Sequence, residues 1–512
     1  MLVKVFASAV LGVEAMTITV EADVVPGIGY VIVGLPDNAV KESIDRILSS
    51  LKNTGFERPR TKVVINMAPA DLKKAGSAYD LPIAVGMLGA TGQVLPDLLA
   101  DFVIMGELSL DGTLQPVRGV LPMAIQAKKE KFKGMILPAQ NAREAAMVSG
   151  LEVYPVSSLA EVAAICNGQG STPALKMDTR AEFFEAQTHT DIDFSEVKGQ
   201  ENIKRALEIA AAGGHNALLI GPPGAGKTML AKRLPTILPP LTLHEALETT
   251  KIHSVAGKLP AHASLVSRRP FRSPHHTISD VALVGGGGNP QPGEISLAHN
   301  GVLFLDELPE FKRTVLEVMR QPMEERRVTI SRARVSIDFP ASFMLVASMN
   351  PCPCGYYNHP GKDCTCSAQM VQRYLNKISG PLLDRIDLHV EVTPVAFPEL
   401  SSQQRAESSA EIRARVLQAR NIQAERFRAY PGTYCNAVMG SRLLKEICTL
   451  DAACAALLKA AMERLNLSAR AYDRILKVAR TIADLAASPA IRPEHIAEAI
   501  QYRSLDREGW AG

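Results

Sequence analysis

The octapeptide GPPGAGKT at residues 221–228 is the feature that most restricts how this 512-residue chain can fold. A short apolar run, NALLI, precedes it, and a helical pattern, TMLAKRLPTIL, follows it. Glycines between a strand and a helix let backbone N–H groups turn toward phosphate oxygens, and the helix N-terminus adds a favourable dipole. The pattern therefore predicts a P-loop, in an α/β sheet, that binds ATP or GTP.

The polar side chains of this loop have separate expected tasks. Lys227 would reach the β- and γ-phosphates, and Thr228 would bind Mg²⁺. The alternative, a chance glycine-rich turn, is disfavoured by the flanking strand and helix. The predicted nucleotide-binding residues of the loop are Gly221, Pro222, Pro223, Gly224, Ala225, Gly226, Lys227 and Thr228.

A second apolar run, GVLFLDE, ends in two carboxylates, Asp306 and Glu307. Taken alone, they would be ordinary surface acids at the end of a strand. Beside a P-loop, Asp306 is expected to hold Mg²⁺ through water, and Glu307 to orient and polarise the attacking water. The pair therefore predicts hydrolysis of the nucleotide as well as binding.

Two further polar residues follow apolar segments. Asn350 ends the run FMLVASMN, and the carboxyl end of a parallel strand faces the ligand crevice, so Asn350 is expected to help place the attacking water. Arg385 lies in GPLLDRIDLHVEV, just before another strand pattern. From these residues alone Arg385 is either a solvated surface charge, the simpler interpretation, or a finger offered to a neighbouring subunit's nucleotide.

The chain is long enough for two to four domains, and its fold class is predicted to be α/β. Residues 1–168 mix strand and helix patterns, and residues 169–192 show no clear period and are expected to be a linker. Residues 193–398 would form the P-loop domain around a mostly parallel sheet. After residue 398 the strand patterns stop, so residues 399–512 predict an all-α domain.

Composition restricts the partners and the location. The net charge of +3 and the 5% aromatic content do not by themselves indicate a nucleic-acid-binding surface. The N-terminus favours a β-hairpin over a signal peptide, and no apolar run reaches about 18 residues, the length of a membrane span. A cytoplasmic location is expected. Four scattered cysteines are interpreted as reduced, packed thiols: Cys166, Cys435, Cys448 and Cys454.

The other four cysteines are clustered, with the spacing C-x-C-x9-C-x-C, in a short turn-rich segment. Four thiolates at about 2.3 Å would form a closed, structural zinc site. His359 is an alternative ligand, and a redox switch or packed thiols are alternative interpretations, which the clustering and the expected reducing location disfavour. The predicted zinc ligands are Cys352, Cys354, Cys364 and Cys366.

The segments LFLDE, SMN, LLDRID and LSARAYDR, together with the P-loop, resemble those of AAA+ ATPases. More narrowly, MNPCPCGYY and SGPLLDRIDLHVEV resemble the magnesium-chelatase-like YifB/ComM family, over essentially the whole chain. The resemblance implies that Asn350 is sensor 1, Arg385 the arginine finger and Arg470 sensor 2. It also implies a ring, most simply a hexamer, with ATP at the subunit interfaces.

Two inserted segments fit the same resemblance. The first, SRRPFRSPHHTISDVALVGGGGNPQPGE, contains the adjacent His275 and His276, for which a loop or interface role is favoured over metal binding. The second, RRVTISRARVSIDFP, alternates apolar and polar residues like the two strands of a hairpin. In related proteins such a hairpin points into the central pore of the ring; the alternative is an exposed polar hairpin. The resemblance implies DNA-phosphate contacts by Arg326, Arg327, Arg332 and Arg334.

The N-terminal domain resembles the proteolytic domain of Lon proteases, in KKAGSAYDLPIAVGML and in GELSLDGTLQPVRGVLPMAIQAKKEKFKGMILP. Ser77 falls at the position of the Lon serine, and Leu121 falls where the lysine is expected. A serine nucleophile needs a base, and leucine cannot serve as one. The domain is therefore expected to be catalytically inactive.

The resemblance implies an ATP-driven hexameric motor on DNA, most specifically a branch-migration helicase that supports natural transformation. The expected cofactors are ATP, Mg²⁺ and Zn²⁺, and the expected partners are DNA and further copies of the chain. The alternative is a chelatase-type ATP-dependent remodelling chaperone that acts on a protein partner. An ATP-dependent protease is disfavoured because of Leu121.

Overall fold

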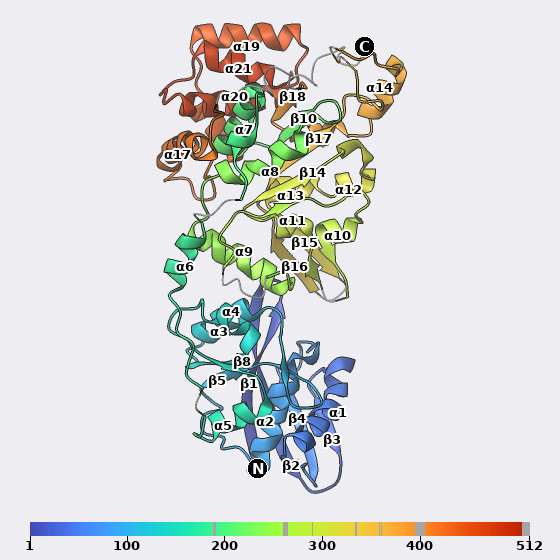
Figure 1. Ribbon diagram of the computed structural model, residues 1–512, viewed down its shortest axis with the longest axis vertical. Coiled ribbons are helices and arrows are strands. Elements are labelled where there is room, and N and C mark those ends of the chain that lie inside the picture. Colours follow the sequence, from blue (N-terminus) through green and yellow to red (C-terminus); the bar gives the residue numbers. More distant parts are fainter. Residues whose placement is uncertain are drawn as a thin grey trace. The chain divides into compact units, whose positions relative to one another are not determined.

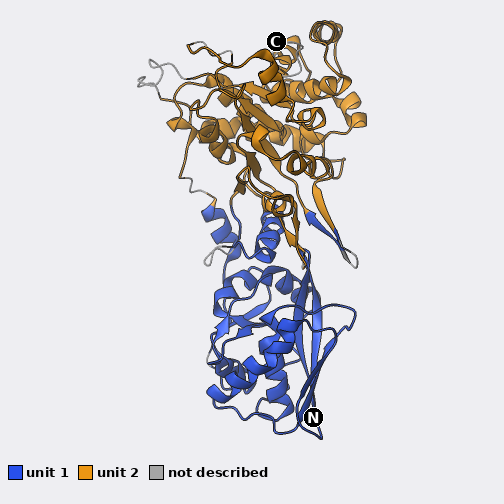
Figure 2. Ribbon diagram, turned by 90° about the vertical axis from the view of Figure 1, so that its right-hand side faces the viewer, with its two compact units in different colours: residues 1–186, 243–267, 331–339 blue, residues 187–242, 268–330, 340–512 orange. Residues whose placement is uncertain are grey.

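The computed structural model describes residues 1–503 apart from residues 171, 188–190, 260–264, 289, 333–334, 358, 360 and 395–404. The chain divides into two compact units, coloured separately in Figure 2. Unit 1 comprises residues 1–186, 243–267 and 331–339, and unit 2 comprises the remaining segments. Both units are therefore assembled from segments that are separate in the sequence.

Unit 1 contains a seven-stranded mixed sheet (Figure 1). In it β1 pairs antiparallel with β2, which confirms the predicted N-terminal hairpin, and the strands on the other side of β1 run parallel. In spatial order the strands are β3 (Tyr30–Val33), β4 (Lys62–Ala68), β2 (Glu14–Val25), β1 (Leu2–Leu11), β5 (Phe102–Ile104), β8 (Gly134–Pro138) and β9 (Glu152–Val156).

Helix α2 (Asp80–Ala90) is buried along its whole length because its sequence is almost entirely apolar. Two glycines let it approach the sheet closely: a Cβ at Gly86 would lie 3.2 Å from the Cβ of Ala22, and one at Gly89 would lie 3.1 Å from Cγ1 of Val3. The other elements described in this unit include α1 (Asn38–Asn53), β6 (Glu107–Leu108), β7 (Leu114–Gln115), α3 (Val120–Lys129), α4 (Ala142–Ala145), α5 (Leu159–Cys166), α6 (Thr179–Ala186), α9 (Leu243–Val255) and all but the last residue of β16 (Val335–Pro340).

Helix α9 belongs to unit 1 although it follows the P-loop in the sequence. The carbonyl of Ser254 accepts a hydrogen bond from the N–H of Gly119, at 3.2 Å. Lys251 pairs with Glu14 at 3.2 Å. Helix α6 lies inside the segment expected to be a linker, where the sequence shows no amphipathic period because it buries only Phe183.

Unit 2 contains a five-stranded parallel sheet, as the recurrent apolar runs predict. The inner strands β14, β17 and β10 are buried at every residue, which explains their continuous apolar sequences. In spatial order the strands are β11 (Phe271–Arg272), β14 (Val302–Leu305), β17 (Met344–Met349), β10 (Ala217–Ile220) and β18 (Leu388–Glu391).

The C-terminal helices share one hydrophobic core with this sheet, so the all-α region is part of unit 2. Helices α17 and α20 both pack on α7. The α-helices described in unit 2 are α7 (Glu201–Gly213), α8 (Lys227–Ile237), α10 (Asp280–Val284), α11 (Glu294–Leu297), α12 (Arg313–Glu317), α13 (Arg320–Glu325), α14 (Ala368–Leu375), α15 (Gly380–Leu383), α17 (Ser409–Arg426), α18 (Ser441–Ile447), α19 (Ala452–Arg464), α20 (Ala469–Leu485) and α21 (Pro493–Gln501).

Two short two-stranded sheets coincide with the inserted segments of the sequence. The first pairs β12 (Gly285–Gly286) with β13 (Gln291–Pro292), and the second pairs β15 (Arg327–Arg332) with β16 (Val335–Pro340). Among the residues described, no helix has the length and apolar character needed to cross a membrane.

Candidate functional site

The P-loop joins the buried strand β10 to helix α8, as predicted. Strand β10 ends at Ile220 and α8 begins at Lys227, so the loop lies at the carboxyl end of the sheet. Gly224 and Gly226 have φ angles of 80° and 85°, a left-handed conformation that favours glycine. This curvature lets backbone N–H groups converge on one point, where phosphate oxygens would bind.

Lys227 is buried, and its Nζ donates to three oxygens: the carbonyls of Gly221 at 2.6 Å and Pro222 at 2.9 Å, and Oδ1 of Asn350 at 3.1 Å. Burial lowers the pKa of Lys227, and the nearby Asp306 and Glu307 oppose this shift. The predicted phosphate-binding lysine and the predicted sensor 1 are therefore in direct contact.

Asp306 lies at the end of β14 and is held by three donors. Thr228 Oγ1 donates to one carboxylate oxygen at 2.7 Å, while the hydroxyl of Ser348 and the N–H of Glu307, at 3.1 Å, donate to the other. A hydroxyl and a carboxylate are the hard oxygen ligands that Mg²⁺ takes in such sites. The residues present thus fit the magnesium ion that the sequence predicts at Thr228 and Asp306.

Ser348 is a site residue that the sequence interpretation missed. It is a fully buried hydroxyl in the apolar strand β17, whose neighbour Ala347 pairs with Leu305 of β14. A lone serine in such a strand, two residues before Asn350, is the signal that could have identified it.

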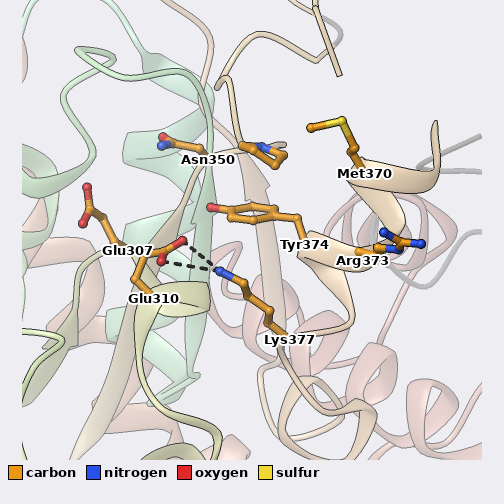
Figure 3. A pocket seen from close by; sticks show the side chains of 8 residues that line it. Glu307, Glu310, Asn350, Met370, Arg373, Tyr374 and Lys377 are labelled. Carbon is orange, nitrogen blue, oxygen red and sulfur yellow. Dashed lines mark hydrogen bonds and ion pairs between the residues drawn. The ribbon is translucent and has the colours of Figure 1, made fainter. Parts of the chain in front are cut away.

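A cavity of about 450 Å³ opens beside Glu307 and Asn350 (Figure 3). Tyr374 of α14 points into it, and Lys377 pairs with Glu310 at 3.2 Å. Burial raises the pKa of Tyr374, and the Asn350 backbone hydrogen bond opposes the rise. The cavity therefore connects the predicted catalytic residues to the helix that follows the cysteine cluster.

The predicted arginine finger and the predicted sensor 2 each form an ion pair with an acidic side chain. Arg385 forms an ion pair with Glu324, and Arg470 pairs with Asp384 at 2.6 Å. Asp384 directly precedes Arg385 in the chain, so Arg470 pairs with the residue next to the predicted finger. Among the described residues, neither Arg385 nor Arg470 takes part in the hydrogen bonds of the P-loop site, which join Lys227 to Asn350 and Thr228 to Asp306.

The four clustered cysteines converge. Their Sγ atoms all lie within 4.8 Å of one another, at 3.3 Å for Cys352–Cys354, 3.7 Å for Cys352–Cys364 and 3.5 Å for Cys354–Cys364. Four thiolates at 2.3 Å from a tetrahedral zinc ion would be about 3.8 Å apart. All four, including Cys366, are free thiols. The spacing of the four sulfur atoms therefore fits one zinc ion, which the sequence predicts at these cysteines.

The cysteine segment packs directly on the P-loop. Gly355 has a φ of 85°, and a Cβ there would lie 2.7 Å from Cδ of Pro223. Val371 of α14 contributes to the small apolar cluster around the cysteines. The alternative ligand His359 instead accepts a hydrogen bond from the N–H of Gly361, at 3.0 Å.

The arginines expected to contact DNA differ in their surroundings. The Arg326 guanidinium stacks 5.0 Å from the ring centroid of Tyr434 and bonds to its hydroxyl, and burial lowers the pKa of Arg326. Arg327 pairs with Glu325 at 3.4 Å. The side chain of Arg332 and the whole of Arg334 lie outside the described residues.

In unit 1, the hydroxyl of Ser77 donates to Glu107 at 2.5 Å. Leu121 is fully buried in α3, and its N–H donates to Glu144 at 2.8 Å. Lys74 is also buried, where it bonds to the carbonyl of Pro69, and burial lowers its pKa. Ser77 thus contacts a carboxylate, and its contacts in the described structure do not include an amine.

The P-loop lies at the carboxyl end of a parallel sheet, where Asp306 accepts a hydrogen bond from Thr228 and Asn350 accepts one from Lys227. This arrangement defines an ATPase domain of the AAA+ class. The sequence profile of magnesium chelatase, subunit ChlI, matches residues 193–400. A second ChlI profile matches residues 20–141, and the profile of the ChlI C-terminal region matches residues 406–503.

Full-length relatives define the family more narrowly. The chain is 46% identical to the competence protein ComM of Haemophilus influenzae, over 98% of this chain and 97% of that protein. It is 44% identical to the uncharacterized protein YifB of Escherichia coli, over 98% of this chain and 96% of that one. The chain therefore belongs to the ComM/YifB family. Lon protease 2 of Bacillus subtilis is 32% identical over 28% of this chain.

Proposed function

We propose that this chain is an ATP-driven hexameric motor that moves DNA, and more specifically a branch-migration helicase that supports natural transformation. The observation that carries the ATPase part is the cluster of Lys227, Thr228, Asp306 and Asn350 around one point of the P-loop. The name of the relative, competence protein ComM, supports a role connected with DNA.

In the proposed reaction, ATP and Mg²⁺ bind at the P-loop. Lys227 would neutralise phosphate charge, Thr228 and Asp306 would hold the ion, and Glu307 would orient water for attack on the γ-phosphate. When bound, Mg²⁺ would supply positive charge that stabilises the transition state. Arg385 would leave Glu324 to reach a neighbouring subunit's nucleotide, which requires a second copy of the chain beside it.

The proposal is tested by steady-state ATP hydrolysis with and without single-stranded or forked DNA. Hydrolysis should rise with DNA in the wild type and be lost in Lys227→Ala and Glu307→Gln. The second variant should still bind ATP, because Glu307 acts on water rather than on the nucleotide. Wild-type hydrolysis that ignores every DNA substrate would contradict the DNA part of the proposal.

The alternative function is a chelatase-type remodelling chaperone with a protein partner. The match of residues 193–400 to magnesium chelatase subunit ChlI favours it. The same ATPase assay separates the two, because a chaperone of this type would be stimulated by its protein partner and not by DNA.

We further propose that the four cysteines hold one structural zinc ion. Cys352 follows Asn350 by two residues, and α14 lies between Cys366 and Arg385, so the ion would stiffen the connection between sensor 1 and the arginine finger. Structural zinc sites supply folding energy locally.

Replacing Cys364 with serine should therefore lower both the zinc content and the ATPase rate. Zinc is measured by elemental analysis of the purified chain, and Cys166→Ala, outside the cluster, is the control that should keep its zinc. A Cys364→Ser chain that lacks zinc but hydrolyses ATP at the wild-type rate would contradict the proposed stiffening.

The Lon-like domain is proposed to be catalytically inactive and to serve assembly or partner contact. The Ser77 hydroxyl donates a hydrogen bond to Glu107, and a buried Leu121 stands where the lysine of Lon proteases is expected. Casein cleavage that depends on Ser77 would contradict this.

A further inference from the structure

Arg326 lies at the junction between helix α13 and the hairpin of β15 and β16. Its φ of 57° is left-handed, a conformation that residues other than glycine keep only where the surrounding contacts hold them in it. Its N–H donates to the carbonyl of Pro322 in α13 at 2.9 Å, and its carbonyl accepts from the N–H of Ala341 at 2.8 Å. Because Ala341 directly follows β16, Arg326 and Ala341 together close the root of the hairpin.

The Arg326 side chain is held by an aromatic ring and two hydroxyls. Its guanidinium carbon lies 5.0 Å from the ring centroid of Tyr434, within the range of a cation–π contact. Its Nη1 donates to the hydroxyl of Tyr434 and, at 3.4 Å, to the hydroxyl of Ser342. These two hydroxyls lie 2.8 Å apart. The root of the hairpin is therefore tied to the segment that carries Tyr434.

Tyr434 is in turn fixed by the C-terminal helices. It lies between α17 and α18, two residues before Asn436, which is fully buried. The main-chain N–H of Asn436 donates to Gln423 of α17 at 3.0 Å. Its side-chain amide donates to Thr481 at 3.0 Å and to Asp484 at 2.8 Å, both in α20. The ring that covers Arg326 is thus anchored in a buried network, although the ring itself is 51% exposed.

Helix α13 also carries the acid that holds the predicted arginine finger. Glu324, two residues before Arg326, forms an ion pair with Arg385. The end of α13 therefore has two contacts, one with the finger and one, through Tyr434, with the C-terminal helices. When Arg385 leaves Glu324 in the proposed reaction, the contact of Arg326 with Tyr434 would still hold the root of the hairpin to those helices.

We propose that Arg326 is a positioning residue that locks the root of the β15–β16 hairpin to the C-terminal helices through Tyr434. Arg326 is then not one of the DNA-phosphate contacts that the sequence resemblance implies. The functional consequence rests on the proposed DNA motor: DNA held by the hairpin stimulates hydrolysis only while this contact is intact. The contact itself requires neither DNA nor nucleotide.

The first test is amide hydrogen exchange of the full-length chain without ATP or DNA, followed by mass spectrometry. In Tyr434→Ala, exchange in β15 should be about tenfold faster, because the ring and the hydroxyl that hold its root are both removed. Tyr434→Phe keeps the ring and should give a smaller rise. Exchange in β15 that stays at the wild-type rate in Tyr434→Ala would overturn the inference.

The matched control is Tyr430→Phe. Tyr430 precedes α18 in the same segment, and its hydroxyl also donates to a side chain, Glu446, at 2.9 Å. Removing that hydroxyl should leave exchange in β15 unchanged. An equal rise in Tyr430→Phe and Tyr434→Phe would mean that the whole segment loosens, and it would overturn the specific role of Tyr434.

The second test separates positioning of the hairpin from contact with DNA. A phosphate contact depends on charge, which Arg326→Lys keeps, whereas stacking on Tyr434 depends on the planar guanidinium. Stimulation of ATP hydrolysis by single-stranded DNA should therefore be lost in Arg326→Lys. It should also be lost in Tyr434→Ala, whose hydrolysis without DNA should equal that of the wild type because the P-loop is untouched.

The salt dependence of DNA binding gives a further readout, measured by fluorescence anisotropy of a labelled single strand. Each lost phosphate contact lowers the slope of log K against log salt concentration by about 0.7. Arg326→Ala should keep the wild-type slope. A slope lower by about 0.7 or more, or normal DNA stimulation in Arg326→Lys, would overturn the inference. Wild-type hydrolysis that ignores DNA would overturn the proposed function, and exchange in β15 would then decide this inference alone.

Discussion

At the scale of single residues, Asp306 shows how the site is built from groups that are ordinary by themselves. Its carboxylate receives hydrogen bonds from Thr228 of α8 and from Ser348 of β17. Each of these side chains is fixed by a buried element, so the carboxylate is held before any ion binds. Local sequence identifies Thr228 and Asp306 because the P-loop motif and the strand end mark them, but Ser348 depends on strand pairing.

Replacing Ser348 with alanine should weaken magnesium binding without unfolding the sheet, since it removes one donor to Asp306 and leaves a small side chain. The Mg²⁺ concentration that gives half-maximal ATPase activity should rise about tenfold or more. Ser348→Thr, which keeps the hydroxyl, is the control. An unchanged Mg²⁺ requirement in Ser348→Ala would contradict the assigned role of this hydroxyl.

At the scale of elements, Asp387 joins three parts of unit 2. Its carboxylate lies 2.9 Å from Nδ1 of His215, before β10, and 3.0 Å from Arg474 of α20, while His215 also contacts Thr481 at 2.8 Å. Asp387 itself directly precedes β18. This buried network ties the segment that carries the predicted finger Arg385 to the helix that carries Arg470.

Asp387→Ala should destabilise unit 2 by about 3–5 kcal/mol, because Arg474 and His215 lose a buried partner. Urea titration followed by loss of nucleotide binding measures this. Asp451→Ala, which removes an exposed N-cap of α19, is the control and should cost about 1 kcal/mol. An equal loss in the two variants would contradict the role of the network.

The contacts of Asp387 with Arg474 and His215 also make the stability of unit 2 depend on pH. Burial raises the pKa of Asp387, but Arg474 and the His215 hydrogen bond outweigh it and hold that pKa below the ordinary value. The stabilisation is therefore fully present above the unfolded pKa of about 3.9 and is lost as the pH falls below it. The difference in stability between wild type and Asp387→Ala should shrink below about pH 4.

Elements also differ in how far sequence could predict them. The apolar runs before Gly221, Asp306 and Asn350 predict three parallel strands because each is buried on both faces. The sequence pattern does not place helix α9 in the N-terminal unit, because its contacts with Gly119 and Glu14 are set by tertiary packing. The acids that hold Arg385 and Arg470 are likewise distant in sequence and carry no local pattern.

At the scale of the whole molecule, the predicted fold class is confirmed: both units are α/β, and the C-terminal region is helical. The boundaries of the units could not be derived from local periodicity, because unit 1 also takes residues 243–267 and 331–339. The proposed ring is an assembly of several copies of the chain. Its central requirement is that Arg385 of one subunit acts on the nucleotide bound by its neighbour.

Mixing two inactive variants tests that requirement. Lys227→Ala keeps its finger but not its P-loop lysine, and Arg385→Ala has the opposite defect. Random mixing in a ring restores roughly a quarter of the interfaces, so ATPase activity should reappear in the mixture. A mixture as inactive as its components, while both variants still assemble, would place the action of Arg385 within its own chain.

The most direct test of the central claim is ATP-dependent movement of DNA by the full-length chain, followed as release of a labelled strand from a forked or four-way substrate. The account predicts release with ATP and Mg²⁺ by the wild type, and none by Glu307→Gln, which binds ATP without hydrolysing it. ATP hydrolysis at a normal rate with no movement of any branched substrate would contradict it.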